Sequence, residues 1–239
     1  MAAANSATFK TQKAFVLGYT GEVGKEVTRL LLEKSFFQQV VLIGRRQVDY
    51  SGQELYKNAD QKVVDFEKLD EHKSAFEDCP IGFCCLGTTR TKSGKDGFYK
   101  VDHDYIVNSA KIAKEAGCQH FSLVSSTGAN KDSSFFYMKV KGQVEQEIKE
   151  MGFSKFTIFR PATLMCDRQE SRFGEKVLVT VLKGINTFSP TFMSVPTATV
   201  AKAMIYKLFY KDHSPSETVE NAKIHELGEA FDKEFGVSP

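Results

Sequence analysis

Two side chains that could move a proton, Tyr137 and Lys141, are four residues apart in the segment from Phe135 to about Glu150. If this segment forms a helix, both side chains lie on the same face of it. A free phenol is a poor acid or base at neutral pH, but an ammonium group one helical turn away favours its phenolate form. The spacing therefore indicates an acid–base pair, in which the lysine could also hold the ribose of a cofactor.

A serine pair, Ser125 and Ser126, ends the apolar run that begins at His120. A hydroxyl there could hydrogen-bond a reacting carbonyl oxygen and stabilise the negative charge that develops on it. Each feature has a plain structural alternative, because Tyr and Lys share this spacing on many helices and Ser-Ser often caps a strand. Their order along the chain, behind a glycine-rich segment, favours a serine, tyrosine and lysine set that acts on a carbonyl compound.

The segment from Lys13 to Gly24 predicts a strand, a glycine turn and a helix in succession. Its three glycines permit a tight turn, close approach of a ligand to the backbone, and close packing of the helix on the strand. The first N–H groups of a helix are unpaired and lie at its positive end, so a pyrophosphate is the expected occupant. The spacing G-x-x-G-x-x-G departs from the dinucleotide fingerprint G-x-G-x-x-G, so a turn that only packs is the alternative. No Lys-Ser or Lys-Thr pair follows, which argues against a P-loop.

Arg45 and Arg46 follow the apolar run from Val40 to Gly44, which is the second predicted strand. A site for plain NAD normally has an acidic residue about twenty residues past the glycines, where it holds the ribose hydroxyls. Guanidinium groups attract a 2′-phosphate instead, so the pair predicts NADP(H) rather than NAD(H). The alternative is a solvated basic pair at a strand end. Asp65, in the predicted third strand over 62–66, is placed to meet the adenine edge.

Apolar runs that alternate with helical patterns predict an α/β fold, a doubly wound parallel sheet of Rossmann type. Further strands are expected over 81–87, 120–126 and 155–161, and helices over 69–76, 98–116, 174–182 and 198–210, with a final helix or short strand over 219–235. Ligands of such a sheet lie beyond the carboxyl ends of the strands, where the strand order reverses, which places 86–90 at the site. We expect a flexible tail over 1–12 and a single domain over 13–239. Its part from 162 to 239 would form a small C-terminal lobe on the substrate or partner side.

Composition limits the classes of function. The 239 residues carry 32 basic and 30 acidic side chains, a net charge of +2, which argues against an electrostatic interface for nucleic acid. No apolar stretch is long enough to span a bilayer and no signal peptide is evident, so an intracellular, soluble protein is expected. The five cysteines form no C-x-x-C pair and are expected as buried, reduced thiols. The histidines form no pair at ligand spacing, so no metal site is predicted.

The order of glycine loop, serine-ended strand, Y-x-x-x-K helix and Phe159-Arg160-Pro161 resembles the short-chain dehydrogenase/reductase superfamily, in its atypical G-x-x-G-x-x-G branch. Four longer strings are similar to the Tat-interacting-protein oxidoreductase family. They are LIGRR at 42–46, VDFEKLD at 64–70, GFCCLGTTR at 82–90 and CDRQESR at 166–172. These strings are more specific than the superfamily motifs, and the resemblance extends over nearly the whole chain.

The resemblance implies roles for individual residues. The general acid or base falls on Tyr137, the lysine on Lys141, and the serine on Ser125 or Ser126. Contacts near the nicotinamide are expected from Leu164 and Arg172. The full set of expected cofactor contacts is Gly18, Thr20, Gly21, Glu22, Val23, Gly24, Arg45, Arg46, Asp65, Phe66, Leu86, Gly87, Tyr137, Lys141, Leu164 and Arg172.

Two hypotheses for function follow. The first is an NADPH-dependent reductase that transfers hydride to a carbonyl substrate by means of the serine, tyrosine and lysine set. The second is a catalytically silent regulator that senses NADPH and acts through protein partners. The family resemblance implies pro-apoptotic, growth-suppressing (tumour-suppressor) proteins that contact nuclear import receptors and transcription machinery, in the cytoplasm and nucleus, with the nuclear envelope as a further location. Fold does not imply function, and the substrate and oligomeric state stay open.

Overall fold

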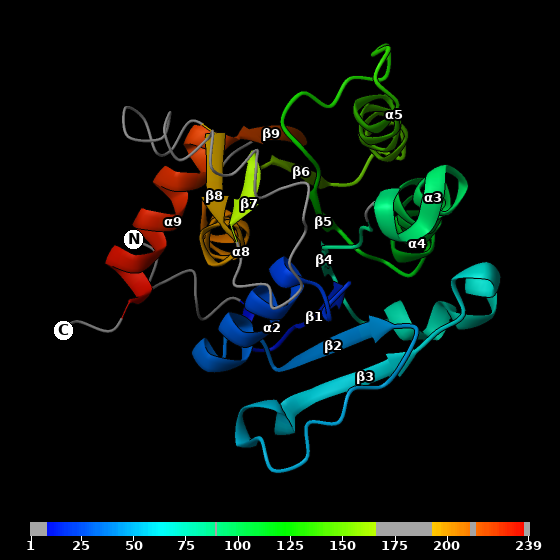
Figure 1. Cartoon of the computed structure of the whole chain (residues 1–239). Coiled ribbons are helices and arrows are strands. Elements are labelled where there is room, and N and C mark those ends of the chain that lie inside the picture. Colours follow the sequence, from blue (N-terminus) through cyan, green and yellow to red (C-terminus); the bar gives the residue numbers. More distant parts are fainter. Residues whose placement is uncertain (1–8, 89, 166–192, 211–213, 237–239) are drawn as a thin grey trace.

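Seven parallel strands form one sheet in the computed structural model of the chain, which describes residues 9–88, 90–165, 193–210 and 214–236 (Figure 1). The strands are β1 (Lys13–Leu17), β2 (Gln39–Gly44), β3 (Ala59–Val63), β4 (Ile81–Cys84), β5 (His120–Val124), β6 (Lys155–Arg160) and β9 (Ser216–Glu220). Their order across the sheet is β3-β2-β1-β4-β5-β6-β9, so the order reverses between β1 and β4. This topology confirms the predicted doubly wound α/β fold.

Helices cover both faces of the sheet (Figure 1). One layer contains α2 (Glu22–Lys34), α8 (Thr197–Tyr206) and α9 (Asn221–Phe235), and the 3-10 turn η4 (Lys207–Phe209) follows α8. The other contains α3 (Arg90–Tyr99), α4 (Tyr105–Glu115), α5 (Phe136–Glu150) and the 3-10 helix η2 (Phe66–Phe76). A hydrophobic cluster lies between the sheet and each layer. Because both faces are covered, the central strands consist mostly of apolar residues.

Alternate residues of β1 enter opposite clusters, as the two-residue period of a strand requires. Phe15 belongs to the cluster under α4 and α5, whereas Val16 belongs to the cluster under α2 and α8. The neighbouring strand β4 leaves space for the Phe15 ring, since a Cβ at Gly82 would lie 2.1 Å from it. The two clusters together fix β1, and with it the loop that follows.

Several predicted elements have different bounds in the structure, and two of them differ most. β3 ends at Val63, so Asp65 lies beyond it and caps η2, where its carboxylate accepts from the Glu67 N–H at 2.9 Å. β3 is an edge strand, and Val63 is exposed in it. The apolar residues on which the prediction of this strand rested are therefore mostly not the residues that pair with β2. The predicted helix over 98–116 is instead α3, a π-helical turn η3 (Lys100–Asp104) and α4 in succession.

Of the described C-terminal residues, those of β9 form the last strand of the main sheet, and those of α8 and α9 belong to the helices of one of its layers. The segment predicted over 219–235 contains both alternatives, since β9 pairs with β6 and α9 follows it directly. Among the described residues, only β7 (Thr163–Met165) and β8 (Ser194–Pro196) form a separate two-stranded sheet. The expected C-terminal lobe stays a prediction. The predicted helix over 174–182 and most of the 1–12 tail lie outside the described residues.

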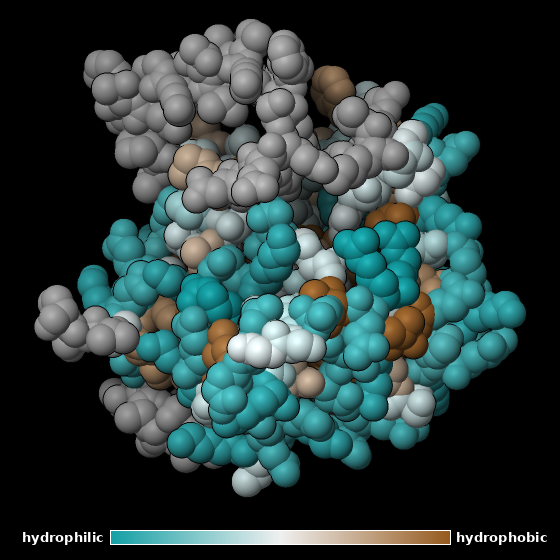
Figure 2. Space-filling model, turned by 60° about the horizontal axis from the view of Figure 1, so that its bottom comes forward, coloured by the Kyte–Doolittle hydropathy of each residue, from teal (hydrophilic) through white to brown (hydrophobic). Residues whose placement is uncertain are grey.

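The face shown in Figure 2 is mainly hydrophilic, and hydrophobic residues occur on it as separate small areas. A 3-10 turn, η1 (Glu54–Asn58), precedes β3, which is an edge strand of the sheet. In the part of the chain that the structure describes, no helix is long and apolar enough to cross a membrane.

Candidate functional site

The turn after β1 packs so closely that two of its three glycines have no space for a side chain. Gly18 has a φ of 75°, and a Cβ there would lie 2.6 Å from the carbonyl carbon of Cys85. A Cβ at Gly24 would lie 2.2 Å from the Gly18 carbonyl oxygen. At Gly21 the nearest such atom would be 3.3 Å away, and Gly21 is exposed. Packing therefore does not require a glycine at position 21. The Gly21 N–H donates to the Gly18 carbonyl oxygen at 2.9 Å, so the amide groups left for a ligand are those that follow it at the start of α2.

Gly21 is the N-cap of α2, and no side chain caps this end of the helix. The first amide groups of α2 therefore lack a side-chain partner and lie at the positive end of the helix dipole. Thr20 is exposed and Glu22 is half-buried, while Val23 and Gly24 are buried against the sheet. This geometry fits a pyrophosphate group at the start of α2.

Tyr19 connects the glycine turn to the end of β2. Its ring is 2% exposed and lies against Gly44, where a Cβ would be 2.8 Å from it. Its hydroxyl donates to the carbonyl oxygen of Arg46 at 2.7 Å. Burial raises the pKa of Tyr19 despite the nearby Arg46 charge, so the hydroxyl remains a donor. The exposed guanidinium groups of Arg45 and Arg46 thus follow β2 directly, on a backbone that Tyr19 holds.

The Lys141 ammonium group lies 2.8 Å from a carboxylate oxygen of Asp102. The two side chains are only 7% and 2% exposed. The other carboxylate oxygen of Asp102 accepts from the Thr88 N–H at 2.7 Å, in the loop after β4. Burial alone would lower the pKa of Lys141, but the Asp102 charge outweighs it and the pKa is raised. The ammonium is therefore charged throughout the physiological range.

Asp102 lies on the π-helical turn η3. Such a turn inserts one extra residue into a helix and redirects the side chains around it, and it occurs often at functional sites. The next two residues point elsewhere, since the His103 ring lies 2.9 Å from Asp104 and 2.8 Å from Glu147. The turn therefore separates the Asp102 carboxylate from its acidic neighbour.

Tyr137 is 41% exposed near the start of α5, on the same face of the helix as Lys141. Its ring centroid lies 5.4 Å from that of Phe98 on α3, which is buried. The side chain is thus fixed on one side by an aromatic contact and accessible on the other. The structure places Tyr137 and Lys141 together in the way that the spacing predicted.

The two serines differ in their surroundings. Ser125 is 6% exposed, and its hydroxyl donates to a carboxylate oxygen of Glu145 on α5. Glu145 also binds Arg160 of β6 through two hydrogen bonds, of 3.0 and 2.6 Å. The hydroxyl of Ser126 is half-buried and lies 3.4 Å from the Thr127 carbonyl oxygen. The Ser125 proton is therefore engaged inside the fold.

The other residues that are expected to contact the cofactor differ in how exposed they are. Gly87 is exposed and Leu86 is half-buried in the loop after β4. The Phe66 side chain is buried and stacks on Tyr105 with ring centroids 5.1 Å apart, so its ring belongs to the core. Leu164 is half-buried on β7. Arg172 lies outside the described residues.

Four cysteines, Cys79, Cys84, Cys85 and Cys118, are free thiols, as predicted, and Cys166 lies outside the described residues. Burial raises the pKa of Cys84 to about 12 and that of Cys79 to about 11, so these thiols are unreactive at neutral pH. Among the described residues, no group of three His, Cys, Asp or Glu side chains could hold a metal ion.

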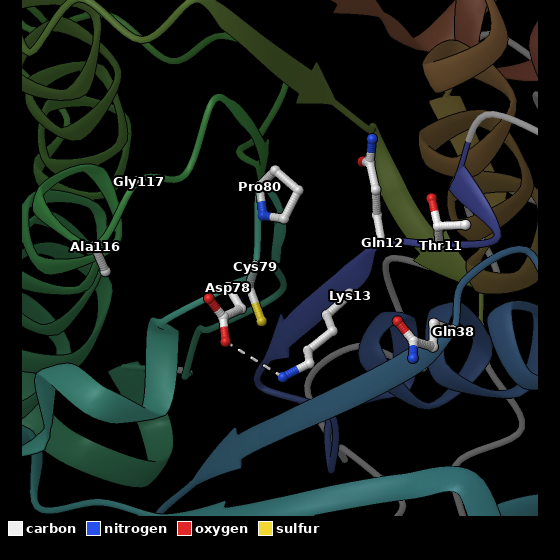
Figure 3. A pocket seen from close by; sticks show the side chains of 9 residues that line it. All are labelled: Thr11, Gln12, Lys13, Gln38, Asp78, Cys79, Pro80, Ala116 and Gly117. Carbon is white, nitrogen blue, oxygen red and sulfur yellow. Dashed lines mark ion pairs between the residues drawn. The ribbon is translucent and has the colours of Figure 1, made fainter.

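A separate hollow of about 460 Å³ lies at the amino-terminal ends of the strands, on the side of the sheet away from the glycine turn (Figure 3). Its lining includes Lys13, Asp78 and Cys79, and the Lys13 ammonium lies 3.5 Å from the Asp78 carboxylate. Ligands of doubly wound sheets bind beyond the carboxyl ends of the strands. We therefore do not assign this hollow to the cofactor.

Three residues of the site escaped the sequence analysis: Tyr19, Asp102 and Glu145. A signal was present for two of them. Glu145 follows Lys141 by four residues, on the face that already carries Tyr137. Asp102 precedes Ile106 by four residues, so a charged side chain lies on the apolar face of the predicted helix. A charge in such a position indicates a buried partner.

Comparison with known proteins gives three findings. The model of a family described as NAD(P)H-binding matches residues 18–210. Protein HTATIP2 of Rattus norvegicus is 46% identical over 226 residues, which cover 94% of this chain and 93% of the rat protein. Protein FMP52-1, described as mitochondrial, of Scheffersomyces stipitis is 33% identical, with 92% of this chain and 99% of that protein covered.

Solved structures share the fold. A putative NAD-dependent epimerase/dehydratase of Bacillus halodurans has a TM-score of 0.66 at 22% identity, with 90% of this chain and 99% of that chain covered. MoeE5, solved in complex with UDP-glucuronic acid and NAD, has a TM-score of 0.67 at 13% identity, with coverages of 95% and 83%. At these identities the likeness concerns the fold alone.

Proposed function

This chain belongs to the NAD(P)H-binding family, and from that premise we propose that it is an NADP(H)-dependent reductase of the short-chain dehydrogenase/reductase type. The observation that carries the proposal is the pair of Tyr137 and Lys141 on α5, in one fold with the uncapped start of α2. The two are linked through the loop after β4, because Thr88 contacts the Asp102–Lys141 pair and Cys85 packs against Gly18. A cofactor along this loop would reach from the glycine turn to the tyrosine.

The cofactor would bind along the carboxyl ends of β1, β2 and β4. Amide groups at the start of α2 would hold the pyrophosphate, with Thr20 and Gly21 beside it. Arg45 and Arg46 would hold the 2′-phosphate, because a charge-assisted contact of this kind contributes about 1.5 to 3 kcal/mol. Asp65 and the Phe66 backbone would lie near the adenine. Further contacts are proposed for Gly18, Glu22, Val23, Gly24, Leu86, Gly87, Leu164 and Arg172.

The proposed chemistry is reduction of a carbonyl group. When bound, the reduced cofactor supplies the hydride. Tyr137 donates its phenolic proton to the carbonyl oxygen, and Lys141 holds the ribose and favours the phenolate that remains. Ser126 donates a hydrogen bond to the same oxygen as negative charge develops. We favour Ser126 over Ser125 for this role because the Ser125 hydroxyl donates to a buried carboxylate, that of Glu145, whereas the Ser126 hydroxyl donates only over a long 3.4 Å contact to the Thr127 carbonyl oxygen.

Binding and turnover test this proposal separately. Calorimetry with NADPH and NADH should show tighter binding of NADPH. With a small carbonyl compound that the wild type reduces, Tyr137→Phe should lower kcat by about 10² to 10⁴ and leave the affinity for NADPH unchanged. Full activity of Tyr137→Phe would show that the tyrosine is not the acid.

A regulatory role is the second candidate. One observation favours it: Phe135, at the start of α5 and next to the proposed site, is 77% exposed. An exposed aromatic side chain at this position would contact a protein partner, such as a nuclear import receptor or transcription machinery in the cytoplasm or nucleus, with effects on apoptosis and growth. Capture of such a receptor should then change when NADPH is added. Equal capture with and without NADPH would argue against a cofactor sensor.

A further inference from the structure

The segment 45–48, which follows β2, is bound by side chains of two other elements. From the glycine turn, the Tyr19 hydroxyl donates to the Arg46 carbonyl oxygen at 2.7 Å. From the edge strand β3, the Gln61 amide binds both backbone groups of Val48. Its Nε2 donates to the Val48 carbonyl oxygen at 2.9 Å, and its Oε1 accepts from the Val48 N–H at 2.8 Å. The two side chains also meet, since the Tyr19 hydroxyl lies 3.1 Å from Gln61 Oε1.

We propose that Tyr19 and Gln61 are positioning residues that set the preference for NADP(H) over NAD(H), because they fix the backbone that carries Arg45 and Arg46. This inference rests on the proposed function, because it assigns the two guanidinium groups to the 2′-phosphate. Neither Tyr19 nor Gln61 touches the cofactor in this scheme. Both act through the backbone of the segment 45–48.

The exposure of Arg45 and Arg46 explains why the backbone between β2 and Val48 must be fixed. A long charged side chain on an exposed segment loses conformational freedom when it binds a phosphate, and this loss reduces the affinity that the contact provides. If the backbone is already ordered in the free protein, only the side chains remain to be ordered. The hydrogen bonds at Arg46 and Val48 supply that order before the cofactor arrives.

Tyr19 also connects the two proposed phosphate sites, because it lies in the turn between β1 and α2. Its ring is 2% exposed, and it fills the space that a side chain at Gly44 would take, since a Cβ there would lie 2.8 Å from it. The ring is therefore fixed as well as the hydroxyl. The pyrophosphate and the 2′-phosphate belong to one cofactor molecule, so a rigid link between their sites favours a ligand that carries both. NAD(H) carries only the pyrophosphate.

The hydroxyl of Tyr19 and the amide of Gln61 can each be removed with little change in shape. Burial raises the pKa of Tyr19, so its hydroxyl stays protonated and donates at neutral pH. Phenylalanine keeps the ring against Gly44 and removes this donor. Leucine at position 61 has neither the donor nor the acceptor that binds Val48. Gln61 is half-buried on an edge strand, which makes this position tolerant of the change.

The test compares the affinities for NADPH and NADH by calorimetry in the wild type, Tyr19→Phe and Gln61→Leu. Each variant should bind NADPH about tenfold more weakly and bind NADH as the wild type does. The double variant should lose less than the product of the two single losses, because both substitutions release the same segment. Tyr50→Phe is the matched control, since it removes a hydroxyl two residues after the segment and keeps a ring that stacks on Tyr56 with centroids 3.9 Å apart. It should resemble the wild type.

Phosphorus NMR of bound NADPH gives a second readout, which the stability of the fold does not change. The second pKa of a free phosphate monoester is about 6, and guanidinium groups that bind its dianion lower this pKa. In the complex with Tyr19→Phe, the pKa of the 2′-phosphate should return toward the free value by up to about one pH unit, which corresponds to the tenfold loss of affinity.

The possible results separate the inference from the proposed function. If Tyr19→Phe does not fold, Gln61→Leu supplies both comparisons. An unchanged ratio of the two affinities in the folded variants, or equal losses for NADPH and NADH, would overturn the inference. Failure of the wild type to bind NADPH would instead refute the proposed function.

Discussion

Gly21→Ala should separate binding of the cofactor from stability of the fold. The backbone at Gly21 has φ −83° and ψ 167°, a conformation that alanine adopts freely. The added Cβ would lie 3.3 Å from the Gly18 carbonyl oxygen, so only a shift of a few tenths of an ångström is needed. Alanine is a poorer N-cap than glycine, which costs up to about 1 kcal/mol. In a chain of this size, that lowers Tm by about 2 to 4 °C.

The effect on binding should be much larger, because the new methyl group would lie where the pyrophosphate approaches the start of α2. Loss of one charge-assisted contact with a backbone N–H corresponds to about 1.5 to 3 kcal/mol, or roughly 10- to 150-fold in the dissociation constant. NADPH at 100 times its dissociation constant should stabilise the wild type by about 2.7 kcal/mol. After a 30-fold loss of affinity, the same concentration stabilises by only about 0.9 kcal/mol.

Thermal unfolding with and without NADPH, together with calorimetry, measures both quantities on the same samples. Gly24→Ala is the contrasting variant, because its Cβ would lie 2.2 Å from the Gly18 carbonyl oxygen and 2.8 Å from the Gly18 carbonyl carbon. It should lose several kcal/mol of stability even without a ligand. If Gly21→Ala bound NADPH as tightly as the wild type, the glycine turn would not be the pyrophosphate site, and the reasoning from the open amide groups at the start of α2 would be wrong.

Three further outcomes are expected. Replacing Arg45 and Arg46 with alanine should weaken NADPH binding by about ten- to a hundredfold and leave NADH binding nearly unchanged; equal losses for both cofactors in calorimetry would contradict a 2′-phosphate site. Glu145→Gln should lower the free energy of unfolding by about 1.5 to 3 kcal/mol, because it removes the charge of the buried carboxylate that binds Arg160 and leaves Arg160 with the exposed Glu220 alone; a loss below about 0.5 kcal/mol in urea unfolding would refute this. Burial and two nearby lysines lower the pKa of His120 to about 4. The unfolded chain therefore binds more protons below pH 6.5, and on the order of 2 kcal/mol of stability should be lost as the pH falls from 6.5 toward 4; His120→Gln should show a shallower loss, and an identical profile would exclude His120 as the cause.

The elements around the glycine turn could be predicted from sequence because local patterns determine them. The apolar run of β1, the restart of periodicity in α2 and the spacing of Tyr137 and Lys141 each depend on neighbours in the chain. The paired strands lie within or close to the predicted runs, apart from β3 and β9. Both of these edge strands consist mostly of polar residues, so hydrophobicity does not mark them as strands.

The partners of the charged residues could not be predicted, because they depend on long-range packing. Asp102 and Lys141 are 39 residues apart, and their contact requires the π-helical turn, which has no known signature in the local sequence. A regular helix over 98–116 would point Asp102 in a different direction. The contact of Ser125 with Glu145 likewise needs β5 and α5 to meet across a loop of eleven residues, 125–135. Spacing on one helix is visible in a sequence, whereas the element that packs against that helix is not.

Of the polar site residues on α5, Tyr137 is the one whose substitution can distinguish an enzyme from a sensor, because the other two form buried ion pairs. Lys141 and Glu145 are both buried and paired with other elements, so a change at either combines loss of chemistry with loss of structure. Tyr137 is one turn earlier, is 41% exposed, and has an aromatic contact that phenylalanine would keep. Tyr137→Phe therefore removes one oxygen and leaves both ion pairs intact. If the chain is a reductase, this variant loses turnover while cofactor and partners still bind; if it is a sensor, every property of the wild type should survive.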